Sequence, residues 1–288
     1  MRHLDTEALR VLVAVVDCGG FTAAADRIGR SQASVSLAIA RLERGVGRRL
    51  LHRTTRKVSL TESGEVLVGY GRRINALEDE ALTVIAGDEG EQLVRIGMPD
   101  DYLDAVGLPL VNRFTAAYPA TRVETLCDFS YRLEAMIDHG EIDLAIITRE
   151  AGLPKGEFLR SEPLVWYGAL EPGAEFATPL PLALFPEWCR ARPQILATLD
   201  SVGKPWRIAY TSSHFHGVES AVASGLAVTA LPRSAASPRL RPIGPAAGLP
   251  ALPSLELAFL LPEHEQLSAR RLANTLRGTF QRSAEAVC

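Results

Sequence analysis

The sequence predicts an α/β protein made of three parts: a small helical head, one long helix, and a larger body. Residues 1–60 combine helical periodicity with a basic segment, which indicates a compact helical head. Residues 61–89 carry apolar side chains at alternating spacings of three and four, which indicates one long linker helix. In residues 90–288, short apolar runs alternate with amphipathic helical patterns, as in α/β folds.

The head begins with three predicted helices. In the segment Leu9–Val16, apolar residues recur at i, i+3, i+4 and i+7, and Gly19-Gly20 ends this first helix. Thr22 is expected to cap the second helix, which ends at Gly29. Ser31 is expected to cap the third.

The third predicted helix has a buried face and an exposed face. Its buried stripe consists of Val35, Ile39, Leu42 and Val46. Its exposed face carries Ala33, Leu37, Ala40 and Arg44, flanked by Ser36 and Arg41, with Gln32 and Ser34 in the first turn. A helix, a tight turn and a second helix with a polar front fit the major groove of DNA. Three amphipathic helices alone would suit any small helical protein equally well.

The basic segment RTTRKVSLT (residues 53–61) favours the DNA interpretation. Its turn-like centre between apolar positions predicts a two-stranded wing with exposed basic side chains. Residues 1–60 hold eleven basic and five acidic side chains, a net charge of +6, which leaves −9 for the rest of a chain whose total is −3. A basic head on an acidic body is expected when only one domain meets phosphate.

The head resembles the signature of LysR-type transcriptional regulators. The matching segments are FTAAA at 21–25, SQASVS at 31–36, Ile39, RLE at 41–43 and LTESG at 60–64. The resemblance extends over effectively the whole chain. It implies a winged helix-turn-helix that binds double-stranded promoter DNA, a linker through which copies form homodimers or homotetramers, and a body that binds a small-molecule effector. RNA polymerase is a further expected partner, and no cofactor is expected.

The expected DNA contacts combine both arguments. They are Thr22, Ser31, Gln32, Ala33, Ser34, Ser36, Leu37, Arg41, Arg53, Thr54 and Arg56. One position departs from the family pattern, because many members carry a long polar side chain where this chain has Leu37, and Ala38 follows. Thymine methyl contacts and DNA shape are therefore expected to supply more of the specificity than bidentate base pairing does.

The linker carries an apolar stripe, which we call the seam. It consists of Leu67, Tyr70, Ile74, Leu77, Ala81 and Val84. Such a stripe either packs against its own head or pairs with a second copy. Because the next domain begins only near Gln92, we expect pairing, as the resemblance also implies.

The body is expected to hold eight strands and five helices. The strands are Leu93–Gly97, Arg122–Cys127, Leu144–Thr148, Leu164–Ala169, Leu180–Leu184, Arg207–Thr211, Ala227–Leu231 and Leu255–Leu261. The helices are Asp101–Ala117, Ser130–Asp138, Gln194–Val202, Phe215–Ser224 and Glu263–Arg282. Their alternation predicts parallel sheets. The resemblance implies a two-lobed body like a periplasmic binding protein, with lobe I at 90–160 and 262–288 and lobe II at 161–261.

The effector is expected at the carboxyl ends of strands, where helix N-termini present free N–H groups. The candidates there are Asp100, Ser130, Thr148, Trp166, Thr211 and Ser212. Each hydroxyl alone also suits a helix cap. Because Asp100 would repel a simple carboxylate, we expect an effector with a donor group such as an amine or hydroxyl.

No enzyme is expected. The sequence lacks a phosphate-binding loop with its Lys-Ser/Thr and a G-x-S-x-G elbow, and His214-x-His216 without clustered partners is more typical of a solvated loop than of a metal site. Two alternatives stay open. One is a solute-binding or small-molecule enzyme body whose basic head is not used for promoter binding. The other is a structural adaptor, which would show no ligand-dependent thermal shift.

The four cysteines are far apart and suggest free thiols in a reducing cytoplasm, with a redox-sensing Cys189 as the alternative. Acidic residues replace the positive flank of a signal peptide, and no run reaches the roughly 20 apolar residues needed to span a bilayer. We therefore expect a soluble cytoplasmic protein.

Overall fold

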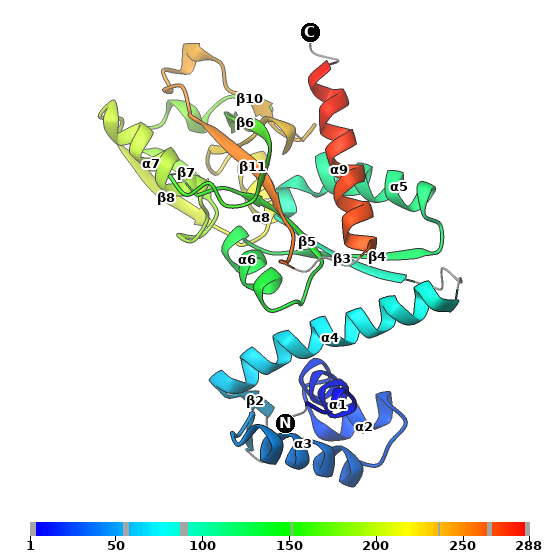
Figure 1. The fold of residues 1–288 in the computed structure, drawn as a ribbon. Helices are drawn as coiled ribbons and strands as arrows, with labels where there is room; N and C mark the ends of the chain where they lie inside the picture. The colour runs from blue at the N-terminus through cyan, green and yellow to red at the C-terminus, as the bar shows by residue number, and fades with distance from the viewer. Residues whose placement is uncertain are drawn as a thin grey trace.

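The computed structural model describes residues 4–53, 58–86, 92–150, 152–235, 237–263 and 267–285. The head contains the helices α1 (Thr6–Asp17), α2 (Phe21–Arg27) and α3 (Gln32–Val46) and the strands β1 (Leu51–Arg53) and β2 (Val58–Leu60). The long helix α4 (Glu62–Ala86) follows. In Figure 1, α4 runs between the head and the body.

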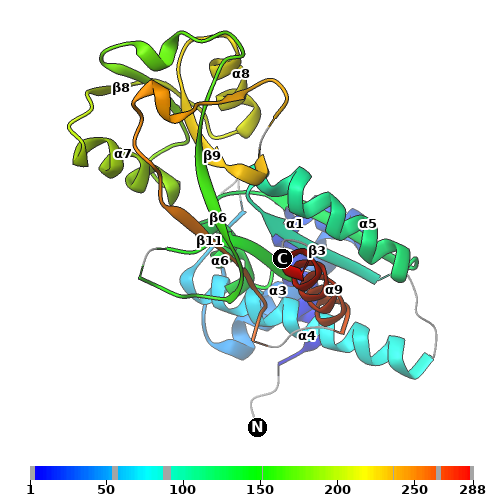
Figure 2. The ribbon, with the colours of Figure 1, turned by 90° about the horizontal axis from the view of Figure 1, so that it is seen from above.

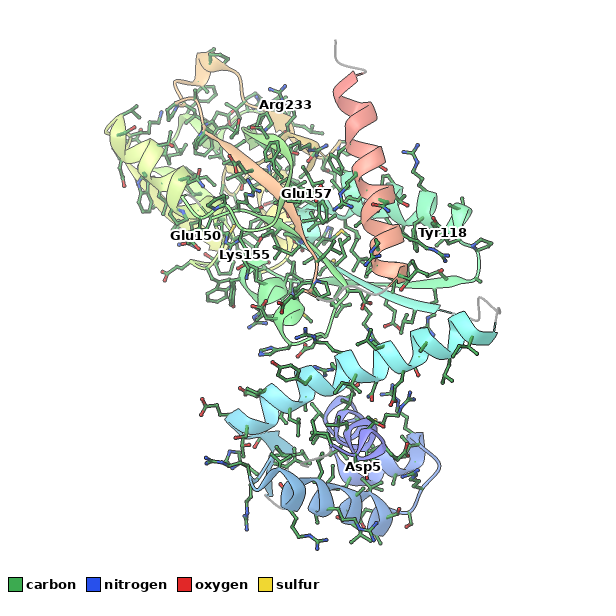
Figure 3. The ribbon with its side chains drawn as sticks, in the orientation of Figure 1. Asp5, Tyr118, Glu150, Lys155, Glu157 and Arg233 are labelled. Carbon is green, nitrogen blue, oxygen red and sulfur yellow. The ribbon has the colours of Figure 1, made fainter. Side chains whose placement is uncertain are left out.

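The ends of the head helices show which capping predictions hold. Asp5 caps α1 by accepting hydrogen bonds from the backbone N–H groups of Glu7 (3.1 Å) and Ala8 (3.3 Å), and Figure 3 shows Asp5 beside this helix. Ser31 caps α3 as predicted. The prediction that Thr22 caps α2 is wrong, because the helix already begins at Phe21 and its cap position is a glycine without a side-chain hydrogen bond.

The predicted buried stripe of α3 forms the centre of the head core. Val35 and Ile39 are fully buried and pack with Leu9 and Leu12 of α1. The strands β1 and β2 pair antiparallel, as expected for a wing, and Leu51 lies opposite Leu60. The residues between these strands, 54–57, lie outside the described part of the chain.

Helix α4 begins by packing closely on the head. A Cβ at Gly64 would lie 2.0 Å from the carbonyl oxygen of Leu50, so only glycine allows this approach. Gly71 likewise faces Leu9 and Val13 of α1. Because both glycines lie on the side of α4 that faces the head, the entry of the linker is fixed by backbone contact.

The body is built on a seven-stranded mixed sheet. In spatial order its strands are β10 (Arg241–Pro242), β6 (Glu157–Gly168), β11 (Ser254–Leu260), β5 (Leu144–Thr148), β3 (Gln92–Met98) and β4 (Thr121–Cys127), and β9 (Thr229–Pro232) also pairs with β6. A separate parallel pair consists of β7 (Leu180–Leu184) and β8 (Trp206–Thr211). Strand β3 is parallel to β4 and β5, but β11 is antiparallel to both β5 and β6.

The expectation of parallel sheets is therefore only partly correct. Strands β6 and β11 carry the chain between the two lobes in opposite directions, which makes their pairing antiparallel. Figure 2 shows them running from one lobe into the other. Strand β6 also begins seven residues before the predicted strand at Leu164, because its first half pairs with β11. The short strand β10 was not predicted.

The body helices cover the sheets of both lobes. They are α5 (Leu108–Ala117), α6 (Ser130–Asp138), α7 (Ala191–Ser201), α8 (Phe215–Ala223) and α9 (Leu267–Glu285). The helix predicted from Asp101 is wrong at its start, because the segments Asp100–Tyr102 and Leu103–Gly107 form a 3₁₀ turn and a π turn. Contacts to the rest of the body hold this segment: a Cβ at Gly107 would lie 2.4 Å from Met98 Sδ.

Each lobe has a core of its own. In lobe I, Ile96 of β3 and Phe114 of α5 pack with Leu272 of α9. In lobe II, Leu182 of β7 packs with Leu199 of α7. Two separate cores joined by β6 and β11 make a two-lobed body with a space between the lobes.

Candidate functional site

The exposed face of α3 is the first candidate site. Gln32, Ala33 and Ser34 are exposed in its first turn, and Leu37 keeps 48% of its surface exposed on the same face. Ser36 is only partly exposed, and Arg41 is exposed. These six lie where the sequence placed them, on a side of α3 that the head core leaves free.

The hydroxyl of Ser31 has a structural role. It accepts a hydrogen bond from the backbone N–H of Ser34 (3.2 Å) and so caps α3. Thr22 is exposed on α2. The remaining predicted contacts, which are Thr54, Arg56 and the side chain of Arg53, fall outside the described part of the chain.

Four arginines surround the exposed end of α3 without a carboxylate partner among the described residues. They are Arg41, Arg44, Arg48 and Arg49, all exposed. Three of them were not among the predicted contacts: Arg44 was predicted only to be exposed, and Arg48 and Arg49 were counted only as basic charge. The signal for Arg48 and Arg49 was their position directly after Gly47, which ends α3 in a left-handed conformation with a φ of 75°.

The seam of α4 divides between two environments. Leu67 and Ile74 pack partly against the head core, whereas Tyr70 and Leu77 keep 54% and 53% of their surface exposed. Ala81 is also exposed, and nothing is described for the side chain of Val84. Val66, which was not predicted, extends the exposed part of this stripe, since at 100° per residue it lies within about 60° of Tyr70, Leu77 and Ala81.

The second candidate site is a cavity of about 390 Å³ between the two lobes of the body. The lobe I wall comes from the ends of β3, β4 and β5 and the start of α6. The lobe II wall comes from the segment after β7, the start of α7 and the loop before α8. Its position outside strand ends is the one that the sequence argument predicted.

Three of the predicted effector residues line this cavity: Asp100, Ser130 and Thr148. Ser130 and Thr148 are buried, and the hydroxyl of Ser130 accepts a hydrogen bond from the backbone N–H of Thr148 (3.0 Å). This bond ties the first turn of α6 to the end of β5. The Ser130 hydroxyl therefore already has a structural partner.

The other three predicted effector residues do not line it. Trp166 is 4% exposed in the lobe II core, where its indole N–H donates to the carbonyl of Pro250 (2.8 Å). Ser212 exchanges hydrogen bonds with the backbone of His214, and Thr211 ends β8 in an exposed position. Trp166 is therefore a core residue of lobe II, and the loop before α8 reaches the cavity through Ser213 and His214 instead.

Asp100 and Arg190 each form polar interactions that connect the two lobes across the cavity. Asp100 of lobe I accepts a hydrogen bond from the backbone N–H of Phe215 (2.7 Å), the first residue of α8. Burial raises the pKa of Asp100, while this N–H group lowers it. Arg190 of lobe II donates to the carbonyl of Thr148 (2.6 Å) and pairs with Glu134 (2.7 Å).

Next to Asp100, Asp101 also lines the cavity. Burial, reinforced by the charge of Asp100, raises the pKa of Asp101 to about 7. Sequence reasoning placed Asp101 at the start of a helix and so missed this role. The signal was the repeated aspartate directly after a predicted strand.

Besides further charged residues such as Asp128, Arg132 and Arg192, the wall has an apolar and aromatic part. Phe129 packs edge-on against Phe185 (centroids 6.2 Å apart) and against Trp188 (6.1 Å), which is 53% exposed. Cys127 and Cys189 also line the cavity, and burial raises the pKa of the Cys189 thiol to about 11. A thiol with a raised pKa is a poor nucleophile at neutral pH, which does not favour the redox-sensor alternative.

Within the described ranges, no group of three or more His, Cys, Asp or Glu side chains is arranged to hold a metal ion. His214 lines the cavity, whereas His216 contacts Glu219 through Nδ1 (3.2 Å). No single helix in the described part of the chain is long and apolar enough to cross a membrane, although α1 and α2 together pass that test with a bend of 118° between them.

The fold and the two sites define a class of protein: a regulator with a DNA-binding head and a ligand-binding body. Residues 6–65 match the family model described as bacterial regulatory helix-turn-helix protein, lysR family, and residues 87–281 match the LysR substrate binding domain. The chain belongs to the LysR family of transcriptional regulators.

Two curated relatives span most of the chain. The transcriptional regulator DgdR of Burkholderia cepacia is 34% identical over 90% of this chain and 88% of its own length. The transcriptional regulator PecT of Dickeya dadantii is 33% identical over 87% of this chain and 79% of its own. These relatives are transcriptional regulators rather than enzymes, which excludes the enzyme alternative.

A solved full-length structure shows the same fold. The crystal structure of ArgP from Mycobacterium tuberculosis is 19% identical and covers 96% of this chain and 97% of its own, with a TM-score of 0.76. The predicted fold class, a winged helix-turn-helix head, a linker helix and a two-lobed body, is confirmed.

Proposed function

We propose that two copies of this chain bind double-stranded promoter DNA together, and that a small molecule in the cavity between the lobes adjusts this binding. The observation that carries the first part is the selective pairing of the arginines in the head. Arg10 pairs with Glu78 and Asp79, and Arg30 pairs with Glu7. The four arginines, which lie on α3 or directly after it, have no such partner among the described residues, and Gln32 and Ser34 are exposed in the first turn of the same helix.

In this proposal the polar residues of the first turn of α3 and the arginines that follow the helix have different functions. Gln32 and Ser34 lie in the first turn and contact base edges in the major groove. Arg48 and Arg49, with Arg53 and Arg56 of the wing, contact phosphates and fix the register of the head on the duplex. Family membership supports these roles, because helix-turn-helix proteins dock in this way.

The pairing of two copies is proposed to occur through the exposed part of the seam. Tyr70, Leu77, Ala81 and Val66 form an apolar stripe on a side of α4 that the head leaves uncovered. A single exposed apolar residue needs no explanation, but a stripe of four at helical spacing suits a second helix. Two paired dimers would make the tetramer that the resemblance implies.

The effector is proposed to act on the polar interactions that connect the two lobes. Asp100 and Arg190 each bridge the cavity, so a ligand that competes for either one changes how the lobes are held. Lobe I contacts α4, and α4 contacts the head, which gives the change a continuous route to the DNA. Contact with RNA polymerase, and a location in the cytoplasm with the promoter, complete the proposal.

Fluorescence anisotropy of the full-length chain on DNA from upstream of its own gene tests the proposal. We expect the affinity for this duplex to exceed that for a shuffled duplex by at least tenfold at physiological salt, and both affinities to fall steeply with salt. Equal affinities for the two duplexes at every salt concentration would contradict promoter recognition.

A further inference from the structure

Among the described residues that line the cavity, Asp101 is a carboxylate that pairs with no other residue. Asp128 pairs with Arg132 (3.4 Å), and Asp100 accepts the N–H of Phe215. No described side chain forms a hydrogen bond or an ion pair with Asp101, which lines the cavity, and its carboxylate accepts a hydrogen bond only from its own backbone N–H. A carboxylate withdrawn from water without a partner is costly, so it is neutralised by a proton or by a cation.

The charged groups near Asp101 increase the uncompensated negative charge around it. Asp100 precedes it in the chain, and Glu162 approaches from β6, so both add negative charge. The nearest arginine of β6, Arg160, forms an ion pair with Glu162 and offers Asp101 no compensating charge. Three further neighbours, the hydroxyl of Tyr102 and the thiols of Cys127 and Cys189, are neutral groups. The turn Arg233–Ala235 packs against this segment, but Arg233 is exposed and its charge acts on Tyr167.

None of the described arginines that line the cavity pairs with Asp101. Arg190 bonds to Thr148 and Glu134, Arg132 bonds to Asp128 and Tyr131, and Arg192 donates to the carbonyl of Phe185 (2.7 Å). Arg192 has no described carboxylate partner, but it lies on lobe II, across the cavity from the 3₁₀ turn that carries Asp101. The lobe I floor therefore has an excess of negative charge.

The cavity also has an aromatic wall, formed by Phe129 of lobe I together with Phe185 and Trp188 of lobe II. Their rings offer apolar surface, and their faces also attract cations. A cavity of about 390 Å³ with an unpaired carboxylate at its floor and aromatic rings at its side fits a compact organic cation.

We propose that the effector is a primary amine with an apolar or aromatic body, whose ammonium group binds Asp101 and Asp100 while its body packs on Phe129, Phe185 and Trp188. This rests on the proposed function only in taking the cavity between the lobes as the ligand site. It excludes simple carboxylates and neutral ring compounds as effectors. A zwitterion is included, because its ammonium meets the same requirement and its carboxylate faces Arg192.

Matched probes test the charge requirement. Binding of 2-phenylethylamine, 2-phenylethanol, 3-phenylpropionate and phenylalanine to the full-length chain is measured by calorimetry at pH 7.5. We expect at least one of the two amines to bind ten times more tightly than either of the other probes. Equal binding of amine and alcohol, tighter binding of the propionate, or no binding of any probe at 10 mM would overturn the proposal.

Two variants assign the effect to one carboxylate. Asp101→Asn keeps the shape and removes the charge, and we expect it to weaken amine binding at least tenfold. Asp104→Asn is the matched control, since Asp104 is exposed outside the cavity and three residues away. It is expected to leave the affinity within twofold of the wild type. An amine affinity that Asp101→Asn leaves unchanged would show that the ammonium is bound elsewhere.

The pH dependence supplies an independent readout. Between pH 6 and pH 8 a primary amine stays protonated, while Asp101 loses its proton. Amine affinity is therefore expected to rise over this range in the wild type and to rise much less in Asp101→Asn. A fall in amine affinity with pH in the wild type would contradict the assignment. DNA binding by the same protein without probe separates this test from the proposed function, because sequence-specific binding with no amine response refutes the ligand class alone.

Discussion

Single arginines of the head differ in what surrounds them, and this difference predicts their function. Arg10 is held by two carboxylates of α4, whereas Arg48 follows the end of α3 without a partner among the described side chains. An arginine that is paired with a carboxylate must give up this ion pair when it binds phosphate. An arginine without a carboxylate partner binds phosphate without this loss. Arg48 is therefore the better phosphate ligand.

The first prediction separates affinity from specificity. Arg48→Ala should weaken binding about equally on all DNA sequences and reduce the salt slope by about 1. Gln32→Ala should instead flatten the discrimination among operator variants, because a good base-edge contact supplies roughly 1–3 kcal/mol of it. Salt titrations on a set of single-base variants measure both effects. A change of base preference in Arg48→Ala without one in Gln32→Ala would reverse these roles.

The second prediction concerns Asp101 and stability. Its pKa is about 7 in the folded chain but ordinary in the unfolded chain, so between about pH 4 and pH 7 the folded state keeps a proton that the unfolded state has lost. Folding stability therefore falls as pH rises through this window, by at most about 4 kcal/mol. Asp101→Asn removes this loss and should be more stable than the wild type at pH 8, with the gap closing toward pH 4.

Urea unfolding at pH 5 and pH 8 measures this difference in folding stability between Asp101→Asn and the wild type, and Asp104→Asn is the control. If Asp101→Asn were no more stable than the wild type at pH 8, Asp101 would have a partner that neutralises it in the folded chain.

At the residue scale, the sequence predicted polar positions better than it predicted their partners. Asp100 and Thr148 line the cavity, as expected for polar residues that follow strands and so meet at one edge of a sheet. Ser212 was misplaced, since its hydroxyl turns back to its own loop, which no spacing reveals. Trp166 lies in the lobe II core instead of lining the cavity. The alternation of residues along β6 predicts that the strand has two faces, but it does not predict which face the core covers.

The secondary-structure elements match the prediction where the local apolar pattern alone determines the structure. Strand Leu144–Thr148 and helix Ser130–Asp138 have the predicted bounds, since their apolar patterns are uninterrupted. The segment from Asp101 to Gly107 departs from the predicted α-helix where long-range contacts act: Asp100 just before it binds the start of α8, and Gly107 packs closely on Met98 of β3. The first half of β6 was missed because long-range pairing with β11 makes it a strand.

The third prediction tests the exposed stripe of α4. Leu77→Asp places a charge in the centre of this stripe, where pairing would have to desolvate it, so the dimer should dissociate and tight operator binding should be lost. Leu82→Asp is the matched control, because Leu82 is also exposed but lies about 140° away around the helix. Sedimentation velocity reports the mass. An unchanged mass in Leu77→Asp would mean that α4 serves its own chain alone.

At the scale of the molecule, the described part of α4 contacts both the head and the body. Arg72 bridges the two, with its guanidinium 2.6 Å from the carboxylate of Asp17 in α1 and 3.3 Å from that of Glu141 in lobe I. Arg73 adds a longer contact to Glu263 (3.9 Å). On the same side, Gly69 packs against the backbone of His139. These contacts give the head a defined orientation on the body.

The fourth prediction tests this bridge. Arg72→Ala removes two ion pairs that are largely shielded from solvent, so head and body should unfold less cooperatively, with the head transition shifted to lower temperature. Each pair is expected to contribute on the order of 1 kcal/mol. Arg122→Ala, which removes an exposed ion pair within lobe I, is the control. Calorimetry that shows the same single transition in both variants would mean that Arg72 does not couple the parts.

The arrangement of the three parts could be predicted because each has its own hydrophobic pattern and the head has a specific motif. The placement of α4 between head and body could not, since it depends on the close approach at Gly64 and on single ion pairs such as that of Arg72.

The central claim is that two heads, joined through their linkers, read one stretch of DNA. Selection of duplexes from a random pool by the full-length chain tests it most directly. A symmetric pair of heads should enrich a two-fold symmetric motif, with half-sites separated by about one helical turn or a multiple of it, and Leu77→Asp should lose that enrichment. A pool that stays random, or an enriched motif without two-fold symmetry, would contradict the account.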